Sequence, residues 1–206
     1  INSDTLARRS FSPKKIGIFT QEYSLLEDQP QYRFTNDKEA QKVLPDIIDN
    51  PVQRVTLKGE VSTALKQAFS KKRNIGVVFS GGPAPGGHNV IAGLFDEVKR
   101  YNPDSKVFGF LMGTDGLIQS RYMEITRELV DAHRNMGGFS MIKTGRTKID
   151  SEKKMDASLK TCLNLKLDAL VVIGGDDSNT NAAFLAQHYK KAGIKVIGIP
   201  KTIDGD

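Results

Sequence analysis

Hydrophobic and polar residues follow two alternating patterns through most of the chain. Continuous apolar runs at residues 75–79, 106–111, 169–173 and 196–199 are typical of strands buried on both faces. The segments between them repeat apolar residues at helical spacing. These positions are Val90, Ile91, Leu94, Phe95 and Val98, then Tyr122, Ile125, Leu129, Val130 and His133, then Met155, Leu159, Cys162 and Leu163, and finally Ala182, Leu185, Ala186 and Tyr189. Strands that alternate with helices predict a doubly wound, Rossmann-like parallel sheet.

Residues 1–73 have a different texture. They are rich in turn-forming pairs and predict an N-terminal extension with short strands and a helix near residues 37–48. Residues 74–206 predict the α/β domain, with a turn at 113–116 and a loop at 137–146. The chain opens on isoleucine and stops within a polar motif, so we expect it to be a fragment of a longer polypeptide.

The composition limits the possible partners. A net charge of +6 and a pI near 9.3 favour an anionic ligand, with nucleic acid as the alternative. The basic residues are scattered and no nucleic-acid motif is present, so we expect no nucleic-acid partner. Cys162 is the sole cysteine, which predicts a reducing compartment and a cytoplasmic protein. No apolar run reaches the roughly 18 residues of a membrane span, and we expect no membrane partner.

A glycine-rich loop at residues 80–89 follows the first strand of the domain. Four glycines in seven positions let backbone N–H groups approach an anion, and the helix that follows adds a favourable dipole. A tight strand-to-helix turn is the alternative, but it needs fewer glycines. The loop has neither the dinucleotide fingerprint nor a Walker lysine, which disfavours a dinucleotide-binding oxidoreductase.

Two acidic clusters follow the later strands. Asp176 and Asp177 begin a helix, where one of them would suffice as a cap; the second is better explained by a hard cation such as Mg2+. Lys201, Asp204 and Asp206 follow the last strand, where a surface turn is the alternative. Because the carboxyl ends of parallel strands share one edge, the three clusters should meet. A base, a cation and a metal are what phosphoryl transfer to a hydroxyl requires.

Arg146 lies in a loop directed at the same edge. A guanidinium can hold phosphate oxygens in a bidentate manner, although an isolated arginine is as often a surface ion-pair partner. The three histidines have no metal-ligand spacing.

Taken together, residues 74–206 resemble the phosphofructokinase family, in particular its long-chain, pyrophosphate-dependent branch. The resemblance rests on the glycine loop, Gly-Gly-Asp and Thr-Ile-Asp-x-Asp in this order. It implies Asp204 as the general base, Thr202 beside it on the sugar, and Asp206 supporting the metal and the transferred group. It places Mg2+ on Asp176. The expected reaction is reversible phosphoryl transfer from pyrophosphate to the 1-hydroxyl of fructose 6-phosphate.

The resemblance also implies how the phosphate donor is bound and chosen. The phosphate loop falls on Gly81 and Gly82, and the family's loop arginine on Arg146. Relatives that use ATP have glycine at the position of Asp177 and commonly at that of Lys201, so these two residues favour pyrophosphate. The alternatives are an ATP-dependent 6-phosphofructokinase and a non-catalytic regulatory subunit on the same fold. A homodimer is the expected assembly. The resemblance also implies that this chain is the first domain of a longer two-domain protein, whose second half would carry most sugar-phosphate contacts.

Overall fold

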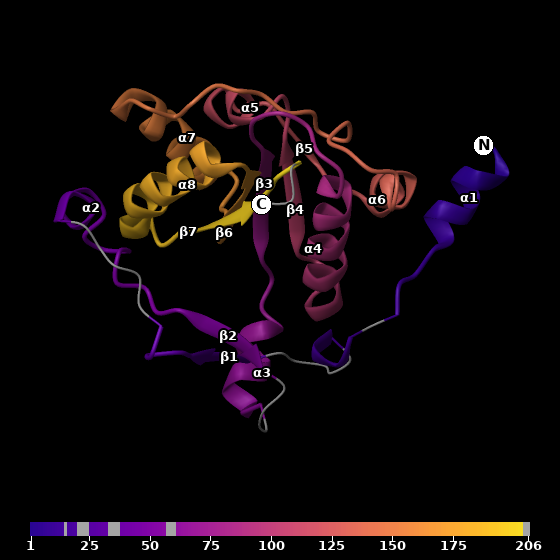
Figure 1. Cartoon of the computed structure of the whole chain (residues 1–206), viewed down its shortest axis with the longest axis horizontal. Coiled ribbons are helices and arrows are strands. Elements are labelled where there is room, and N and C mark those ends of the chain that lie inside the picture. Colours follow the sequence, from indigo (N-terminus) through magenta and orange to yellow (C-terminus); the bar gives the residue numbers. More distant parts are fainter. Residues whose placement is uncertain (15, 20–24, 33–37, 57–60, 204–206) are drawn as a thin grey trace.

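Five strands form the main sheet in the described part of the chain. The structure, a computed structural model, describes residues 1–14, 16–19, 25–32, 38–56 and 61–203. The strand order is β5-β4-β3-β6-β7 (Figure 1). These strands are β3 (Asn74–Phe79), β4 (Lys106–Phe110), β5 (Tyr122–Glu124), β6 (Ala169–Gly174) and β7 (Lys195–Pro200). All pairs are parallel except β4 with β5, so the predicted doubly wound parallel sheet is confirmed, with one antiparallel edge strand.

The chain changes direction across the sheet between β3 and β6. β4 pairs with one side of β3, whereas β6 and then β7 extend the sheet on the other side. β3 and β6 are buried almost from end to end because helices cover both faces, which explains their continuous apolar runs. β7 lies at the edge of the sheet and alternates between exposed and half-buried residues. A ligand site is expected where the strand order reverses, outside the carboxyl ends of β3 and β6.

Helices cover the two faces of the sheet (Figure 1). The side chains of α4 and α6 pack with one face, and those of α5, α7 and α8 with the other. Among the described residues, no helix is both long and apolar enough to cross a membrane. The helices are α4 (Gly87–Tyr101), α5 (Thr114–Ile118), α6 (Arg127–His133), α7 (Glu152–Asn164) and α8 (Asp176–Tyr189), with a short 3-10 turn η2 (Lys190–Ala192) after α8.

Two local predictions were wrong. The helix predicted from Tyr122 to His133 is instead the strand β5 followed by α6. Thr126 separates them: its hydroxyl oxygen accepts a hydrogen bond from Leu129 N at 3.3 Å and caps α6. The turn predicted at residues 113–116 contains the start of α5. The apolar spacing from Tyr122 was read without the contact to β4, which pairs Phe110 with Tyr122.

The N-terminal segment adds several small elements outside the main sheet. No residue of its three helices is buried. The predicted helix near 37–48 is shorter than expected, because Pro45 disfavours helical backbone in the preceding residue. β1 and β2 form a separate antiparallel pair. The elements are α1 (Ser3–Ser10), η1 (Gly17–Phe19), β1 (Leu25–Asp28), α2 (Lys38–Val43), β2 (Gln53–Thr56) and α3 (Thr63–Phe69).

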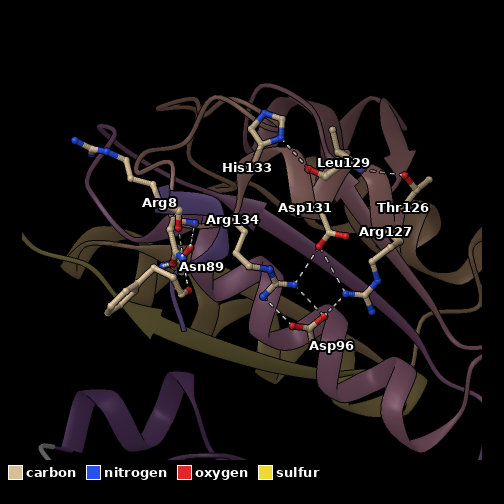
Figure 2. A network of polar contacts seen from close by, with 11 residues as sticks. Arg8, Asn89, Asp96, Thr126, Arg127, Leu129, Asp131, His133 and Arg134 are labelled. Atoms are coloured by element: carbon tan, nitrogen blue, oxygen red, sulfur yellow. Dashed lines mark hydrogen bonds and ion pairs between the residues drawn. The ribbon is translucent and has the colours of Figure 1, made fainter. Parts of the chain in front are cut away.

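Polar contacts and one aromatic stack attach this segment to the α/β domain. Asn135 Nδ2 donates to the carbonyl oxygens of Arg8 and Phe11, each at 2.8 Å, and so holds the end of α1 near α6 (Figure 2). At the opposite end of the sheet, the ring of Phe69 in α3 stacks on Tyr101 of α4 with centroids 4.9 Å apart. A third attachment joins Asp46 to α8 and η2, where Asp46 N donates to Gln187 Oε1 at 2.9 Å and Lys190 Nζ donates to Asp46 O at 2.5 Å.

Candidate active site

The ends of β3, β6 and β7 meet at one edge of the sheet, as the sequence predicted. Ser80 N, just after β3, donates to Ile173 O of β6 at 2.9 Å. Lys201 N, just after β7, donates to Gly174 O at 2.9 Å. The glycine loop, the start of α8 and the segment after β7 are therefore neighbours. Asp204 and Asp206, the predicted base and its support, lie outside the described residues.

The glycine loop is held open by a neighbouring loop at residues 144–148. Gly81 has a φ of +85°, which favours glycine, and its N–H donates to Gly145 O at 2.8 Å. Thr144 Oγ1 donates to the Gly81 carbonyl at 2.7 Å. The helix beyond, α4, begins after Gly86 with no side-chain cap on its first turn. Backbone amides at such a helix start are suited to an anion.

Two cations lie against this loop. Lys201 Nζ donates to Gly82 O at 2.8 Å. Arg146 lies on the other side, where a Cβ built on Gly82 would be 3.4 Å from Nη2. The structure thus brings together Gly81, Gly82, Arg146 and Lys201, the residues predicted to bind pyrophosphate. Among the described residues no carboxylate pairs with Lys201 or Arg146, so their positive charge is available to an anion.

The acidic pair lies at the start of α8, beside the glycine loop. Asp176 and Asp177 are both exposed, and Gly175 precedes them without a side-chain cap. The next residue, Ser178, is buried and its hydroxyl donates to Ser80 Oγ at 2.8 Å. This hydrogen bond joins the helix start directly to the glycine loop. An anion bound by the loop would therefore lie close to both carboxylates.

Asp176 fits one kind of metal site. In the described part of the chain, no three His, Cys, Asp or Glu side chains converge as a ready-made metal cage. One exposed carboxylate suits Mg2+, which takes few protein ligands and keeps phosphate oxygens and water as the rest. Asp176 also lines an open cleft of about 700 Å3 together with Lys201 and Thr202, so a metal there would face the sugar-binding residue predicted from the sequence.

The segment that carries Arg146 alternates between exposed and less exposed residues and is hydrogen-bonded to α5 and α8. Arg146 and Lys148 are exposed, whereas Thr147 is half-buried and Ile149 is fully buried. Asn181 of α8 accepts from Ile149 N at 3.2 Å and donates to Ile149 O at 2.8 Å, as a neighbouring strand would. This alternation directs Arg146 and Lys148 to the same side.

Thr147 fixes the middle of this segment. Its hydroxyl donates to Asp115 Oδ2 at 2.9 Å, and its carbonyl oxygen accepts a hydrogen bond from the hydroxyl of Thr114. Asp115 and Thr114 belong to the first turn of α5. The exposed side chains on either side of Thr147 therefore start from a backbone that α5 and α8 both hold.

Lys148 is a site residue that the sequence analysis missed. Its Nζ lies 3.0 Å from Asp177 Oδ2, whereas the hydrogen bond of Lys201 goes to Gly82. The two residues predicted to select the donor, Asp177 and Lys201, thus have different partners. The spacing of Arg146 and Lys148, two residues apart, was the sequence signal that could have pointed to Lys148.

His88 links the first turn of α4 to the loop at residues 137–146. Its side chain is 1% exposed, and Nε2 accepts a hydrogen bond from Met141 N at 3.1 Å. Burial, and secondarily the charge of His133, lowers the pKa of His88 to about 4, so the ring stays neutral and keeps its acceptor. The parallel rings of Phe79 and Phe139, with centroids 4.0 Å apart, stack the end of β3 against the same loop. The sequence analysis assigned His88 no role.

Comparisons with known proteins agree with this arrangement. The family profile described as phosphofructokinase matches residues 74–206. The pyrophosphate--fructose 6-phosphate 1-phosphotransferase of Porphyromonas gingivalis is 47% identical over 203 residues, which are 98% of this chain and 36% of that protein. The protein of the same name from Treponema pallidum (strain Nichols) is 58% identical over 134 residues, 64% of this chain and 23% of that protein. The chain therefore spans about a third, or less, of the length of these curated relatives.

Solved structures show the same fold. The pyrophosphate-dependent phosphofructokinase from Nitrosospira multiformis matches 65% of this chain and 35% of its own, with a TM-score of 0.58 at 18% identity. The enzyme of that description from Marinobacter aquaeolei matches 64% and 34%, with a TM-score of 0.56 at 20% identity. At these identities the likeness concerns the fold alone. Because the family profile covers well over half of its residues, the chain belongs to the phosphofructokinase family.

Proposed function

We propose that the protein carrying this chain transfers a phosphoryl group from pyrophosphate to the 1-hydroxyl of fructose 6-phosphate. The products would be fructose 1,6-bisphosphate and phosphate. One observation carries the proposal: the side chains of Lys201 and Arg146 both lie against the glycine loop. Two positive charges and the backbone of that loop are therefore close together. The names of the relatives from P. gingivalis and T. pallidum support the choice of substrates.

The donor would lie between the glycine loop and the start of α8. Lys201 and Arg146 would neutralise phosphate charge as it shifts from the transferred group to the leaving phosphate. The amide of Gly82 would hold the phosphate that leaves. Gly81 would shape the phosphate loop through its positive φ, because its own N–H already donates to Gly145 O at 2.8 Å. Fixed donors of this kind need no rearrangement during the reaction. The hydrogen bond between Ser80 and Ser178 holds the glycine loop against the start of α8, and we call the space between these two segments the donor cradle.

Asp176 is our proposed Mg2+ ligand. When bound, the ion would offset the negative charge of the phosphate groups. Its remaining ligands would be phosphate oxygens and water, in keeping with the open cleft at Asp176.

The acceptor would be activated by the segment after β7. Asp204 would take the proton of the sugar 1-hydroxyl as that oxygen forms its bond to phosphorus and the bridging P–O bond of pyrophosphate breaks. Thr202 would contact the sugar, and Asp206 would support the metal and the transferred group. Thr202 lines the cleft beside Lys201, which supports binding of the sugar on the β7 side of the donor.

Donor choice would depend on Asp177 and Lys201. We propose that the Asp177 carboxylate fills the volume that the α-phosphate of ATP would enter, while Lys201 supplies the charge that the smaller diphosphate needs. The exposed position of Asp177 at an uncapped helix start supports this, because that is where a further phosphate group would bind.

The wider organisation is part of the proposal. Residues 74–206 would form the pyrophosphate- and magnesium-binding domain, and residues 1–73 an N-terminal extension. We further propose a cytoplasmic homodimer. Several plant relatives are named as alpha or beta subunits, so an assembly of two different subunits is the alternative. Light scattering of the purified protein should give the mass of a homodimer.

A coupled assay of the intact protein tests the proposed function. Fructose 1,6-bisphosphate formation is followed with fructose 6-phosphate and Mg2+, with either pyrophosphate or ATP as the donor. We expect turnover with pyrophosphate and a far lower rate with ATP. Turnover with ATP alone would instead identify an ATP-dependent kinase, and turnover with neither a regulatory subunit. Asp204→Ala should abolish transfer while leaving the fold intact; near-normal activity would show that the base is another residue.

A further inference from the structure

The feature behind this inference is the ion pair between Lys148 and Asp177. Lys148 Nζ lies 3.0 Å from Asp177 Oδ2, and the two side chains are 59% and 82% exposed. A pair this exposed contributes little to folding stability. Its position is also unusual, because the ammonium group lies at the start of α8, where the helix dipole disfavours a cation. Folding stability alone therefore does not account for the pair.

The backbone holds Lys148 in this place. Residues on both sides of it are anchored, Thr147 to Asp115 and Ile149 to Asn181. Its own carbonyl oxygen accepts a hydrogen bond from Lys154 Nζ at 3.1 Å. The long side chain therefore starts from a fixed point that faces the donor cradle, on the same side as Arg146.

The pair changes the electrostatics of the donor site. An isolated Asp177 carboxylate would repel pyrophosphate as well as ATP, because both are anions that approach the same helix start. With Lys148 beside it, the net charge of the pair is zero, but its volume remains. The carboxylate then excludes the longer donor by occupying space, without a repulsive cost for the shorter one.

We propose that Lys148 is a specificity-determining positioning residue: it holds Asp177 in the donor site and cancels its charge. The proposal rests on the proposed function, since it concerns how pyrophosphate is preferred. It assigns donor choice to a pair formed by a loop residue and a residue at the start of α8, with Lys201 acting separately through its contact with Gly82 O.

Steady-state kinetics of the intact protein test the pair. Lys148→Met should raise KM for pyrophosphate about fivefold, the upper range for an exposed charge pair, and change kcat less than about twofold. Lys148→Arg keeps the charge and should restore KM. Adding Asp177→Asn to Lys148→Met should lower KM again, because the unpaired carboxylate is gone. Lys160→Met removes an exposed lysine of α7 and is the matched control, with no expected change.

Each outcome decides a separate point. If wild-type protein uses pyrophosphate but Lys148→Met behaves like Lys160→Met, the inference is wrong and the proposed function stands. The inference also fails if Asp177→Asn makes the Lys148→Met defect larger, because the carboxylate was then helping by itself. If wild-type protein neither turns over nor binds pyrophosphate in calorimetry, the proposed function falls and the inference with it.

Discussion

Replacing Gly113 by alanine should damage both stability and the donor site. Gly113 is buried, with φ +74° and ψ −146°, a conformation that costs other residues about 1–3 kcal/mol. A Cβ there would clash with Gly145 N and lie 2.9 Å from Gly145 Cα and 3.0 Å from Phe79 O. These are backbone atoms, which cannot rotate away, so overpacking adds about 1–3 kcal/mol. We expect a loss near 4 kcal/mol and a melting temperature lower by roughly 10 °C.

The same change should weaken donor binding, because Gly145 directly precedes Arg146. A displaced Gly145 carries the guanidinium away from Gly82, so KM for pyrophosphate should rise.

Two control variants separate the causes. Gly137→Ala has a similar φ of +83° but open space around the new Cβ, and should cost only about 1 kcal/mol. Gly93→Ala, in the exposed middle of α4 with nothing nearby, should stabilise by about 0.5–1 kcal/mol. Thermal unfolding by circular dichroism measures all three. If Gly113→Ala melts within about 2 °C of Gly137→Ala, the close approach to Gly145 is not the constraint we infer.

Three further predictions concern buried or networked side chains. His88→Leu should cost about 1–3 kcal/mol by leaving Met141 N–H without an acceptor, and His88→Gln should recover part of it. Because the pKa of His88 falls from 6.5 to about 4 on folding, wild-type stability should decrease as the pH falls from 6.5 toward 4, and His88→Gln should lack this component in pH-dependent melting. Burial raises the pKa of Cys162 to about 12, so a thiol reagent at pH 8 should leave it unmodified by mass spectrometry until the protein unfolds. Asp96 accepts hydrogen bonds from Arg127 of α6 and from Arg134, which directly follows α6 (Figure 2), so Asp96→Ala should cost about 1–2 kcal/mol in urea unfolding; an unchanged midpoint would argue that the network contributes nothing.

The sequence predicted the sheet better than the connections. β3 and β6 were readable because strands covered on both faces are apolar throughout. The stripe of α4 was readable because an amphipathic helix repeats its contact with the core. β5 was missed because a strand of three residues is too short to show an alternating apolar pattern. Only its pairing with β4 makes it a strand. The helices α1 and α3 bury no residue, and so left no apolar pattern to detect.

The site divides in the same way. The proximity of Gly81, Gly82, Asp176 and Lys201 could be predicted because each closely follows a predicted strand, and strand ends meet by topology. His88 was not, because its acceptor role depends on Met141, a residue 53 positions away in a loop.

The sequence by itself determined the kinds of elements, their order, and the chemistry gathered at the strand ends, because these depend on local periodicity and on residues next to one another. The tertiary structure alone decided which charges meet. It paired Lys148 with Asp177 and directed Lys201 to the carbonyl of Gly82, although the sequence favoured a joint role for Asp177 and Lys201. The physical reason is that an ion pair depends on distances of a few ångströms between separate loops, and those distances are set only when the helices have packed on the sheet.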